Sequence, residues 1–93
     1  MRAGEDIATR RKRLYMRSIR RGIKEMDLIL GGFADRALGD LTVAQLDAYE
    51  AVLSEHDHDL YQWVSGQAEM PPEHAEMLTR IASDFRQSGA ARG

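Results

Sequence analysis

Apolar side chains recur every three or four residues through most of this chain, the spacing that gathers them on one face of an α-helix. The pattern predicts a first helix over about residues 9–20 and a second from Ile23 to about Ala37. A third helix follows Thr42, because Thr at the N-cap and Gln45 three residues later form a capping box. These three helices make up the first half of the chain.

Two more helices are predicted in the second half. A short fourth helix has Asp57 as its expected N-cap and ends at Gly66. A fifth begins near Pro71-Pro72, since proline is accepted in a first turn, and runs to Gln87. No stretch alternates apolar and polar residues as a strand would. The pattern therefore predicts an all-α protein, a compact five-helix bundle.

The length of 93 residues fits a single domain. We expect a flexible N-terminus over residues 1–8, one helical domain over 9–87 and a flexible C-terminus over 88–93. The chain has no cysteine, so neither disulfides nor a thiolate metal site are available to it. No apolar run is long enough for a membrane span or a signal peptide, which favours a cytoplasmic protein.

Charge is unevenly distributed along the chain. Residues 1–24 contain nine Lys or Arg and two acids, whereas residues 25–93 contain four Lys or Arg and thirteen acids. The basic run at residues 10–13 is open to three interpretations: a nucleic-acid footprint, a solvated helix face, or a surface that docks onto an acidic protein. The solvated face is favoured, because the acidic remainder would repel a phosphate backbone and only Tyr15 is available for stacking.

Candidate catalytic and metal-binding residues are few. His56 and His58 lie beside three acids, but their spacing near a helix start does not turn them toward one ion. No nucleophile–base arrangement or phosphate-binding glycine loop is present. Tyr61 and Trp63 are expected in the core, with a partly exposed interface anchor as the alternative. Without a catalytic constellation, the sequence favours a binding or helper protein over an enzyme.

Gly22 separates the first two predicted helices, as the residue after one or the N-cap of the next. In Arg21-Gly22-x-x-Glu25, each charge complements a helix dipole. An alternative is that Gly22 permits the close approach of another surface, with Arg21 and Glu25 as paired charges beside it. The Gly31-Gly32 pair inside the second helix marks either a close packing contact or a bend.

Several segments together resemble a known family, the small flavinylation factors of succinate dehydrogenase and fumarate reductase found in bacteria and mitochondria. The resemblance covers roughly residues 10–83 and rests on the order and spacing of its motifs. These are the Arg-rich lead-in, the Arg21-Gly22-x-x-Glu25 motif followed by Asp27, and the stretch from Asp57 to Val64, where His58 stands in place of a common proline. Residues 28–34 and 41–50 also resemble family segments.

The resemblance implies a five-helix fold and a non-catalytic assembly factor. Such a factor binds the flavoprotein subunit of succinate dehydrogenase or fumarate reductase and promotes covalent attachment of FAD to a histidine of that subunit, a reaction that the flavoprotein largely performs itself. The partner-binding residues would be Arg21, Gly22, Glu25 and Asp27. FAD would belong to the partner, and we expect no cofactor, metal or nucleic acid bound by this chain, no membrane insertion and a monomer. We expect a bacterial cytoplasmic location, with the mitochondrial matrix as the less favoured alternative. An antitoxin-like or nucleic-acid-binding module is the alternative function.

Overall fold

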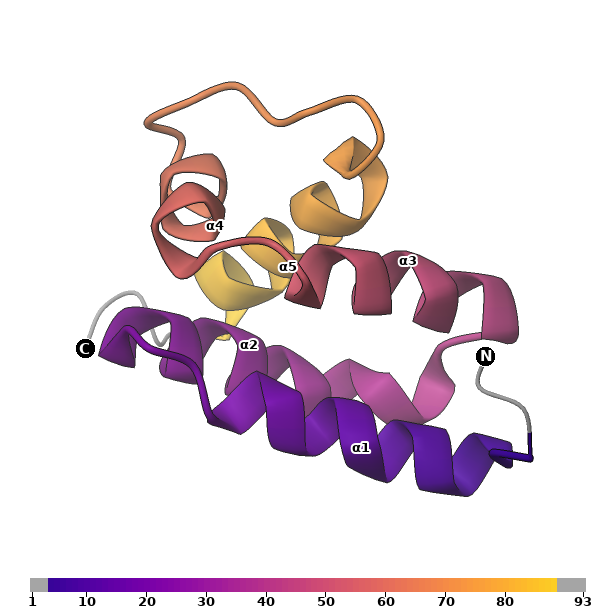
Figure 1. The fold of residues 1–93 in the computed structure, drawn as a ribbon. Coiled ribbons are helices and arrows are strands. Elements are labelled where there is room, and N and C mark those ends of the chain that lie inside the picture. Colours follow the sequence, from indigo (N-terminus) through magenta and orange to yellow (C-terminus); the bar gives the residue numbers. More distant parts are fainter. Residues whose placement is uncertain (1–3, 89–93) are drawn as a thin grey trace.

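The computed structural model describes residues 4–88 and confirms the all-α fold. Five α-helices and one 3-10 turn follow one another along the chain, and no strand occurs within residues 4–88 (Figure 1). The elements are α1 (Ile7–Ile19), α2 (Lys24–Ala37), η1 (Leu38–Asp40), α3 (Val43–Leu53), α4 (Asp57–Val64) and α5 (Ala75–Gln87).

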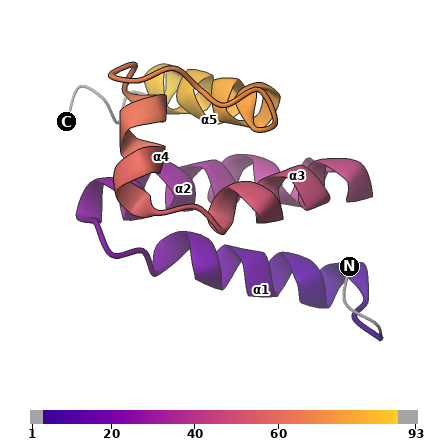
Figure 2. The same cartoon turned by 45° about the horizontal axis from the view of Figure 1, so that its top comes forward.

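The helices lie in tiers (Figure 2). α1 forms one outer tier, α2 and α3 lie in the middle, and α5 covers the opposite side. α4 stands across these tiers at the end where the loop from α1 to α2 turns. That arrangement brings the start of α4 next to this loop, although more than thirty residues separate them in sequence.

α2 supplies the centre of the core. Five of the six side chains in its predicted apolar stripe are at most 5% exposed, and the sixth, Ala37, is partly buried against the core. The other helices contribute Leu14, Tyr49, Leu60 and Ile81, all without measurable exposure. Tyr61 and Trp63 are half-buried and pack against this core rather than inside it. The five buried members of the α2 stripe are Met26, Ile29, Leu30, Phe33 and Ala34.

The glycine pair of α2 marks a packing contact at its first member. Gly31 is buried, and a Cβ built on it would lie 3.3 Å from Cγ2 of Ile19 in α1. At Gly32 a Cβ would meet only the flexible end of the Arg36 side chain. Gly31 therefore lets α1 and α2 approach each other closely, which settles the packing alternative for that residue.

The helices α1, α4 and α5 begin at residues other than the predicted ones. α1 begins at Ile7, two residues early, because Asp6 accepts a hydrogen bond from the Thr9 amide at 2.7 Å. The N-cap of α4 is His56, so the expectation for Asp57 was wrong. α5 begins only at Ala75, after turns over residues 72–74.

The capping box at the start of α3 is confirmed by two hydrogen bonds between Thr42 and Gln45. Of the flexible ends expected at residues 1–8 and 88–93, residues 1–3 and 89–93 lie outside the described residues, whereas Ile7 and Ala8 belong to α1. Flexibility of the two ends stays a prediction.

Candidate functional site

Gly22 lies in the four-residue loop between α1 and α2 and takes neither of the roles expected for it. A glycine that ends a helix usually has a positive φ, and the φ of Gly22 is not positive. The N-cap of α2 is Ile23. Instead, the Gly22 amide donates a hydrogen bond of 2.6 Å to Oδ2 of Asp57. A Cβ built on Gly22 would lie 3.2 Å from the same oxygen. A side chain at position 22 would therefore crowd the carboxylate, which would have to shift by a few tenths of an ångström.

Arg21 points its guanidinium into the protein, and its side chain is only 11% exposed. Nε donates to Oδ1 of Asp57 at 2.7 Å, Nη1 to the Leu53 carbonyl at 2.9 Å and Nη2 to the Glu55 carbonyl at 3.0 Å. Leu53 is the last residue of α3, so the cation serves the C-terminal end of α3 rather than of α1. We call these contacts of Arg21 and Gly22 with Leu53, Glu55 and Asp57 the Arg21 clamp.

Asp27 and Glu25 have opposite placements in the first turns of α2. Asp27 is half-buried, and its carboxylate accepts a hydrogen bond of 2.6 Å from the Arg21 amide. Glu25 is exposed and makes no hydrogen bond or ion pair to any residue in the range 4–88. Nearby, Leu28 is 60% exposed. Of the four predicted site residues, Arg21 and Asp27 hold the loop, whereas Gly22 and Glu25 lie at the surface.

Asp57 was not among the predicted site residues, yet it bonds to two of them. Its carboxylate accepts one hydrogen bond from Arg21 and one from Gly22. Burial raises the pKa of Asp57, but the hydrogen bond from the Arg21 guanidinium and that from the Gly22 amide outweigh this, so the pKa is lowered. The carboxylate therefore stays charged in the folded protein at neutral pH.

The basic run of α1 is not the solvated face that we expected. Arg10 is only 1% exposed, and its Nη2 lies 2.7 Å from Asp47 and 2.9 Å from Glu50 of α3. Arg13 bonds to Glu50 at 2.9 Å and to Glu5 at 2.8 Å. We call Arg10, Arg13, Asp47 and Glu50 the Arg10 cluster. The acidic surface onto which the basic run docks belongs to the same chain.

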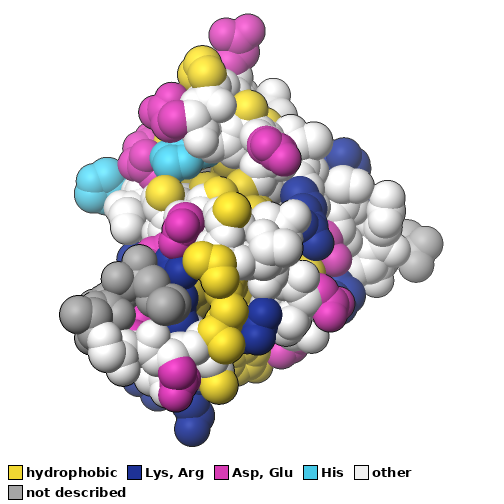
Figure 3. Space-filling model, turned by 90° about the vertical axis from the view of Figure 1, so that its right-hand side faces the viewer, with side chains coloured by type: hydrophobic (Ala, Val, Ile, Leu, Met, Phe, Trp, Pro, Cys, Tyr) yellow, Lys and Arg dark blue, Asp and Glu magenta, His cyan; other side chains and the backbone are white. Residues whose placement is uncertain are grey.

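Basic and acidic side chains are accordingly mixed on the folded surface. On the face shown in Figure 3, Lys and Arg side chains are interspersed with Asp and Glu side chains around a run of hydrophobic side chains. The sequence divides into a basic arm and an acidic body, but the fold brings the two together. The Arg10 cluster removes two of the cations that a nucleic-acid footprint would require.

The histidines offer no metal site in the part of the chain that the structure describes. No group of three or more His, Cys, Asp or Glu within residues 4–88 is arranged to hold an ion. His56 and His58 are exposed. His74 is buried, with Nε2 at 2.8 Å from Glu55 and its ring centroid 6.3 Å from that of Trp63, contacts that join the start of α5 to the core.

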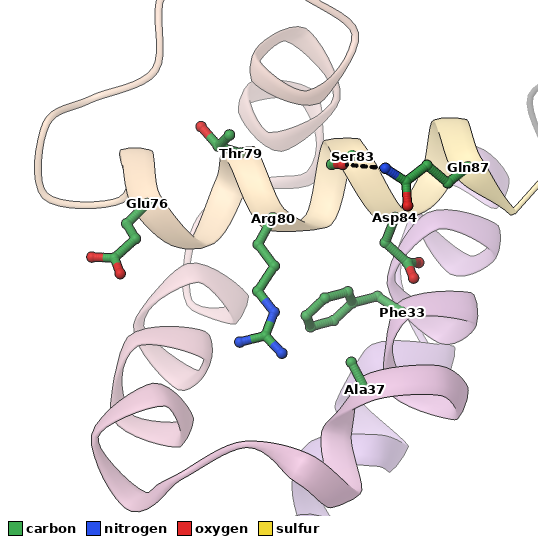
Figure 4. Close-up of a pocket in the computed structure, with 8 residues that line it drawn as sticks. All are labelled: Phe33, Ala37, Glu76, Thr79, Arg80, Ser83, Asp84 and Gln87. Carbon is green, nitrogen blue, oxygen red and sulfur yellow. Dashed lines mark hydrogen bonds between the residues drawn. The ribbon is translucent and has the colours of Figure 1, made fainter.

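An open groove of about 480 Å³ runs between α2 and α5 (Figure 4). The Arg80 guanidinium lies 6.0 Å from the centre of the Phe33 ring at its base. Ser83 accepts a hydrogen bond from Gln87 within the same helix, and within residues 4–88 no hydrogen bond joins its hydroxyl to a basic side chain. The groove therefore contains no activated nucleophile. It is lined by Phe33, Ala37, Glu76, Thr79, Arg80, Ser83, Asp84 and Gln87.

Fold and site define a small all-helical protein whose candidate functional surface is an interhelical loop held by a half-buried arginine. The chain belongs to the family described as the flavinator of succinate dehydrogenase, whose family model matches residues 12–85. The match covers the loop, α2 and the start of α4, and it confirms the family resemblance that the sequence motifs indicated.

Curated relatives are similar over nearly the whole chain. Succinate dehydrogenase assembly factor 2, mitochondrial, of Penicillium rubens is 40% identical over 99% of this chain and 30% of its own length. The proteins of the same name from Candida glabrata and Meyerozyma guilliermondii are 38% and 41% identical, over 94% and 89% of this chain. They are matched over 60% and 65% of their own lengths, so this chain spans between about a third and two thirds of these relatives.

The relatives correct one expectation. We expected a bacterial cytoplasmic location, and this is wrong, because each relative named above is a mitochondrial protein. Within residues 4–88, no helix is long and apolar enough to cross a membrane.

Proposed function

We propose that this chain is an assembly factor that promotes covalent attachment of FAD to a histidine of the flavoprotein subunit of succinate dehydrogenase. The family match over residues 12–85 carries the proposal, since the family is described as a flavinator of that enzyme. The relatives' names as assembly factors support a helper role rather than catalysis. Their names also support a mitochondrial location for this chain.

The docking surface in this proposal is the loop with the first turn of α2. Gly22 is exposed and has no side chain, so a partner surface can approach its backbone closely. Glu25 is exposed and has no polar partner within residues 4–88, so its carboxylate is available to a cation of the partner. Arg21 and Asp27 act on the other side of the same loop, by holding its conformation.

The chemical contribution is conformational. Attachment of FAD requires the isoalloxazine and the histidine nucleophile to be held close and in line, with developing charge stabilised. The flavoprotein supplies both reacting groups and performs the bond-forming step itself, and the FAD is its cofactor. This chain binds as a monomer and favours the flavoprotein conformation in which the two groups meet.

The proposal is tested by producing the succinate dehydrogenase flavoprotein with and without this chain. After denaturation, flavin fluorescence that remains on the flavoprotein polypeptide measures the covalent fraction. We expect a clear increase when this chain is present. Equal signals would refute the proposed function, and running the fumarate reductase flavoprotein in parallel shows whether it is also a client.

Glu25→Ala tests the docking surface against a matched control. Glu25 is the second residue of α2 and Glu76 the second residue of α5, and both are exposed. Both substitutions therefore remove the same favourable charge from a helix N-terminus, about 0.3–1 kcal/mol. We expect Glu25→Ala to reduce covalent flavin strongly and Glu76→Ala to leave it unchanged, with melting temperatures similar in the two variants. Equal activity of the two variants would show that Glu25 is not part of the docking surface.

The alternative functions have no comparable support. The nucleic-acid interpretation depended on the basic run, and the Arg10 cluster commits two of its arginines to α3. No contact of the described residues favours an antitoxin-like module. Binding to duplex DNA that weakens steeply with salt would be the result in favour of the first alternative.

A further inference from the structure

Asp57 is the point at which the candidate docking loop is attached to the rest of the molecule. The loop consists of residues 20–23, which lie outside both flanking helices. Its Arg21 side chain and its Gly22 amide bond to the two different oxygens of one carboxylate, at 2.7 and 2.6 Å. A single side chain thus fixes both the direction of the Arg21 guanidinium and the position of the Gly22 backbone.

This carboxylate is not needed to cap its own helix. The N-cap of α4 is His56, and no side-chain hydrogen bond caps the helix there. Asp57 and Asp59 both lie in the first turn of α4, so both favour it through the helix dipole. Only Asp57 reaches across to the loop, and its side chain is 15% exposed, whereas Asp59 is exposed and has no partner within residues 4–88. The helix therefore does not explain why the aspartate at position 57 points toward the loop.

The neighbouring contacts favour one arrangement of the loop. With Asp57 fixing Nε, the two remaining arms of the guanidinium reach the Leu53 and Glu55 carbonyls at the end of α3. The Arg21 amide in turn bonds to Asp27 in α2. Without the carboxylate, a cation that is 11% exposed would keep only neutral acceptors, and the geometry of its planar fork would be lost.

We propose that Asp57 is a positioning residue for partner binding, which holds the Arg21-Gly22 loop in the shape that the flavoprotein recognises. This inference rests on the proposed function, because it takes the loop and Glu25 as the docking surface. It adds a residue from α4 that does not itself contact the flavoprotein and acts through Arg21 and Gly22. A preformed loop lowers the ordering cost of association, so its loss weakens binding rather than the chemistry.

The test is a titration of the flavoprotein with wild type, Asp57→Ala and Asp59→Ala, with covalent flavin as the readout. The two variants remove the same charge from the same helical turn. For Asp57→Ala we expect the concentration of this chain that gives half-maximal flavinylation to rise about tenfold, because roughly one charge-assisted hydrogen bond is lost. The maximal level of flavinylation should be retained. Asp59→Ala should follow the wild-type curve.

A third variant and a controlled temperature distinguish a change in the shape of the loop from a general loss of stability. Ile81→Val removes one methyl group from the core at α5, the tier opposite α1, and lowers stability without changing the docking surface. All titrations are run at a temperature where circular dichroism shows each variant folded. If Asp57→Ala is not folded there, Asp57→Asn takes its place, because it keeps one acceptor and should give a smaller rise.

Amide exchange reports the loop directly. In wild type we expect the Gly22 amide, bonded to Asp57, to exchange more slowly than the Lys24 amide at the open start of α2. Asp57→Ala should abolish that difference, and Ile81→Val should not. A half-maximal concentration equal in Asp57→Ala, Asp59→Ala and wild type would overturn the inference while leaving the proposed function intact. Wild type that gives no covalent flavin would refute the proposed function, and the inference with it.

Discussion

The Arg10 cluster and the Arg21 clamp both join an arginine to carboxylates more than thirty residues away, yet they differ in what they hold. The Arg10 cluster joins the middle of two helices, α1 and α3, whose backbones are already fixed by their own hydrogen bonds. The Arg21 clamp joins a loop that lies outside both flanking helices to the end of α3 and the start of α4. The first contact therefore stabilises helix packing, whereas the second determines the shape of an exposed surface.

Burial sharpens the contrast. Arg10 is nearly inaccessible, and its Nη1 is buried without a hydrogen-bond partner among the described residues. A buried ion pair of this kind is a modest source of net stability but costs much when only one partner is removed. In the Arg21 clamp all three guanidinium nitrogens donate. Damage to the Arg10 cluster should appear in stability, and damage to the Arg21 clamp in function.

The largest stability loss is expected for Arg10→Ala. It removes the cation between Asp47 and Glu50 and leaves a cavity, which should lower the free energy of unfolding by about 2–3 kcal/mol. Arg10→Met fills the same space and should lose less. Urea unfolding measures both. Flavinylation per folded molecule should stay at the wild-type level. If folded Arg10→Met at saturating concentration gave less covalent flavin than wild type, the Arg10 cluster would affect function as well as stability.

The second-largest effect is expected from acid, which should weaken the Arg10 cluster. Hydrogen bonds from Arg13, and also from Arg10, overcome burial and lower the pKa of Glu50 from 4.5 to about 2. A carboxyl group with a lowered folded-state pKa stabilises the fold above its unfolded pKa and loses that contribution as pH falls through the folded value. The difference in melting temperature between wild type and Glu50→Gln should therefore be full at pH 5 to 7 and shrink toward pH 2. A difference independent of pH would show that Glu50 contributes nothing through its charge.

The smallest effect is expected at a third ion pair, which is more exposed than the other two. Arg36 of α2 forms a two-pronged contact with Asp84 of α5, at 2.7 and 3.0 Å, and the Arg36 side chain is 43% exposed. Arg36→Ala should lower the free energy of unfolding by less than about 1 kcal/mol, and less still in 1 M salt. Arg86→Ala, an exposed residue near the end of α5, is the control for loss of charge. A loss as large as that of Arg10→Ala would contradict the role assigned to burial.

Local features of the fold were predictable from the sequence. The capping box joins Thr42 to Gln45, three residues apart, and the stripe of α2 is a repeat of three and four residues. Both depend only on helical geometry, which a sequence displays directly. The family motif likewise indicated the loop between α1 and α2 as the candidate site.

The direction of the charged side chains was not predictable. Arg10 was expected in solvent and Arg21 at the end of its own helix, because their partners lie 32 to 40 residues away. An aspartate at the start of a helix is expected to cap that helix, so the sequence did not indicate that Asp57 contacts Gly22. Partners across the fold leave no local pattern in a single sequence, because these contacts follow from the packing of α1 against α3 and of α4 against the loop.

The burial of Arg10 and Arg21 has a consequence for proteolysis. The stretch from Arg10 to Lys24 holds eight of the thirteen Lys and Arg residues, and so most of the bonds that trypsin prefers. A protease needs an extended and accessible segment, whereas Arg10 and Arg21 are enclosed by carboxylates and carbonyls of α3 and α4. Cleavage after Arg10 therefore requires α1 to leave α3, and cleavage after Arg21 requires the loop to leave α4. The peptide pattern of limited trypsin digestion would thus report on two separate openings of the same small molecule.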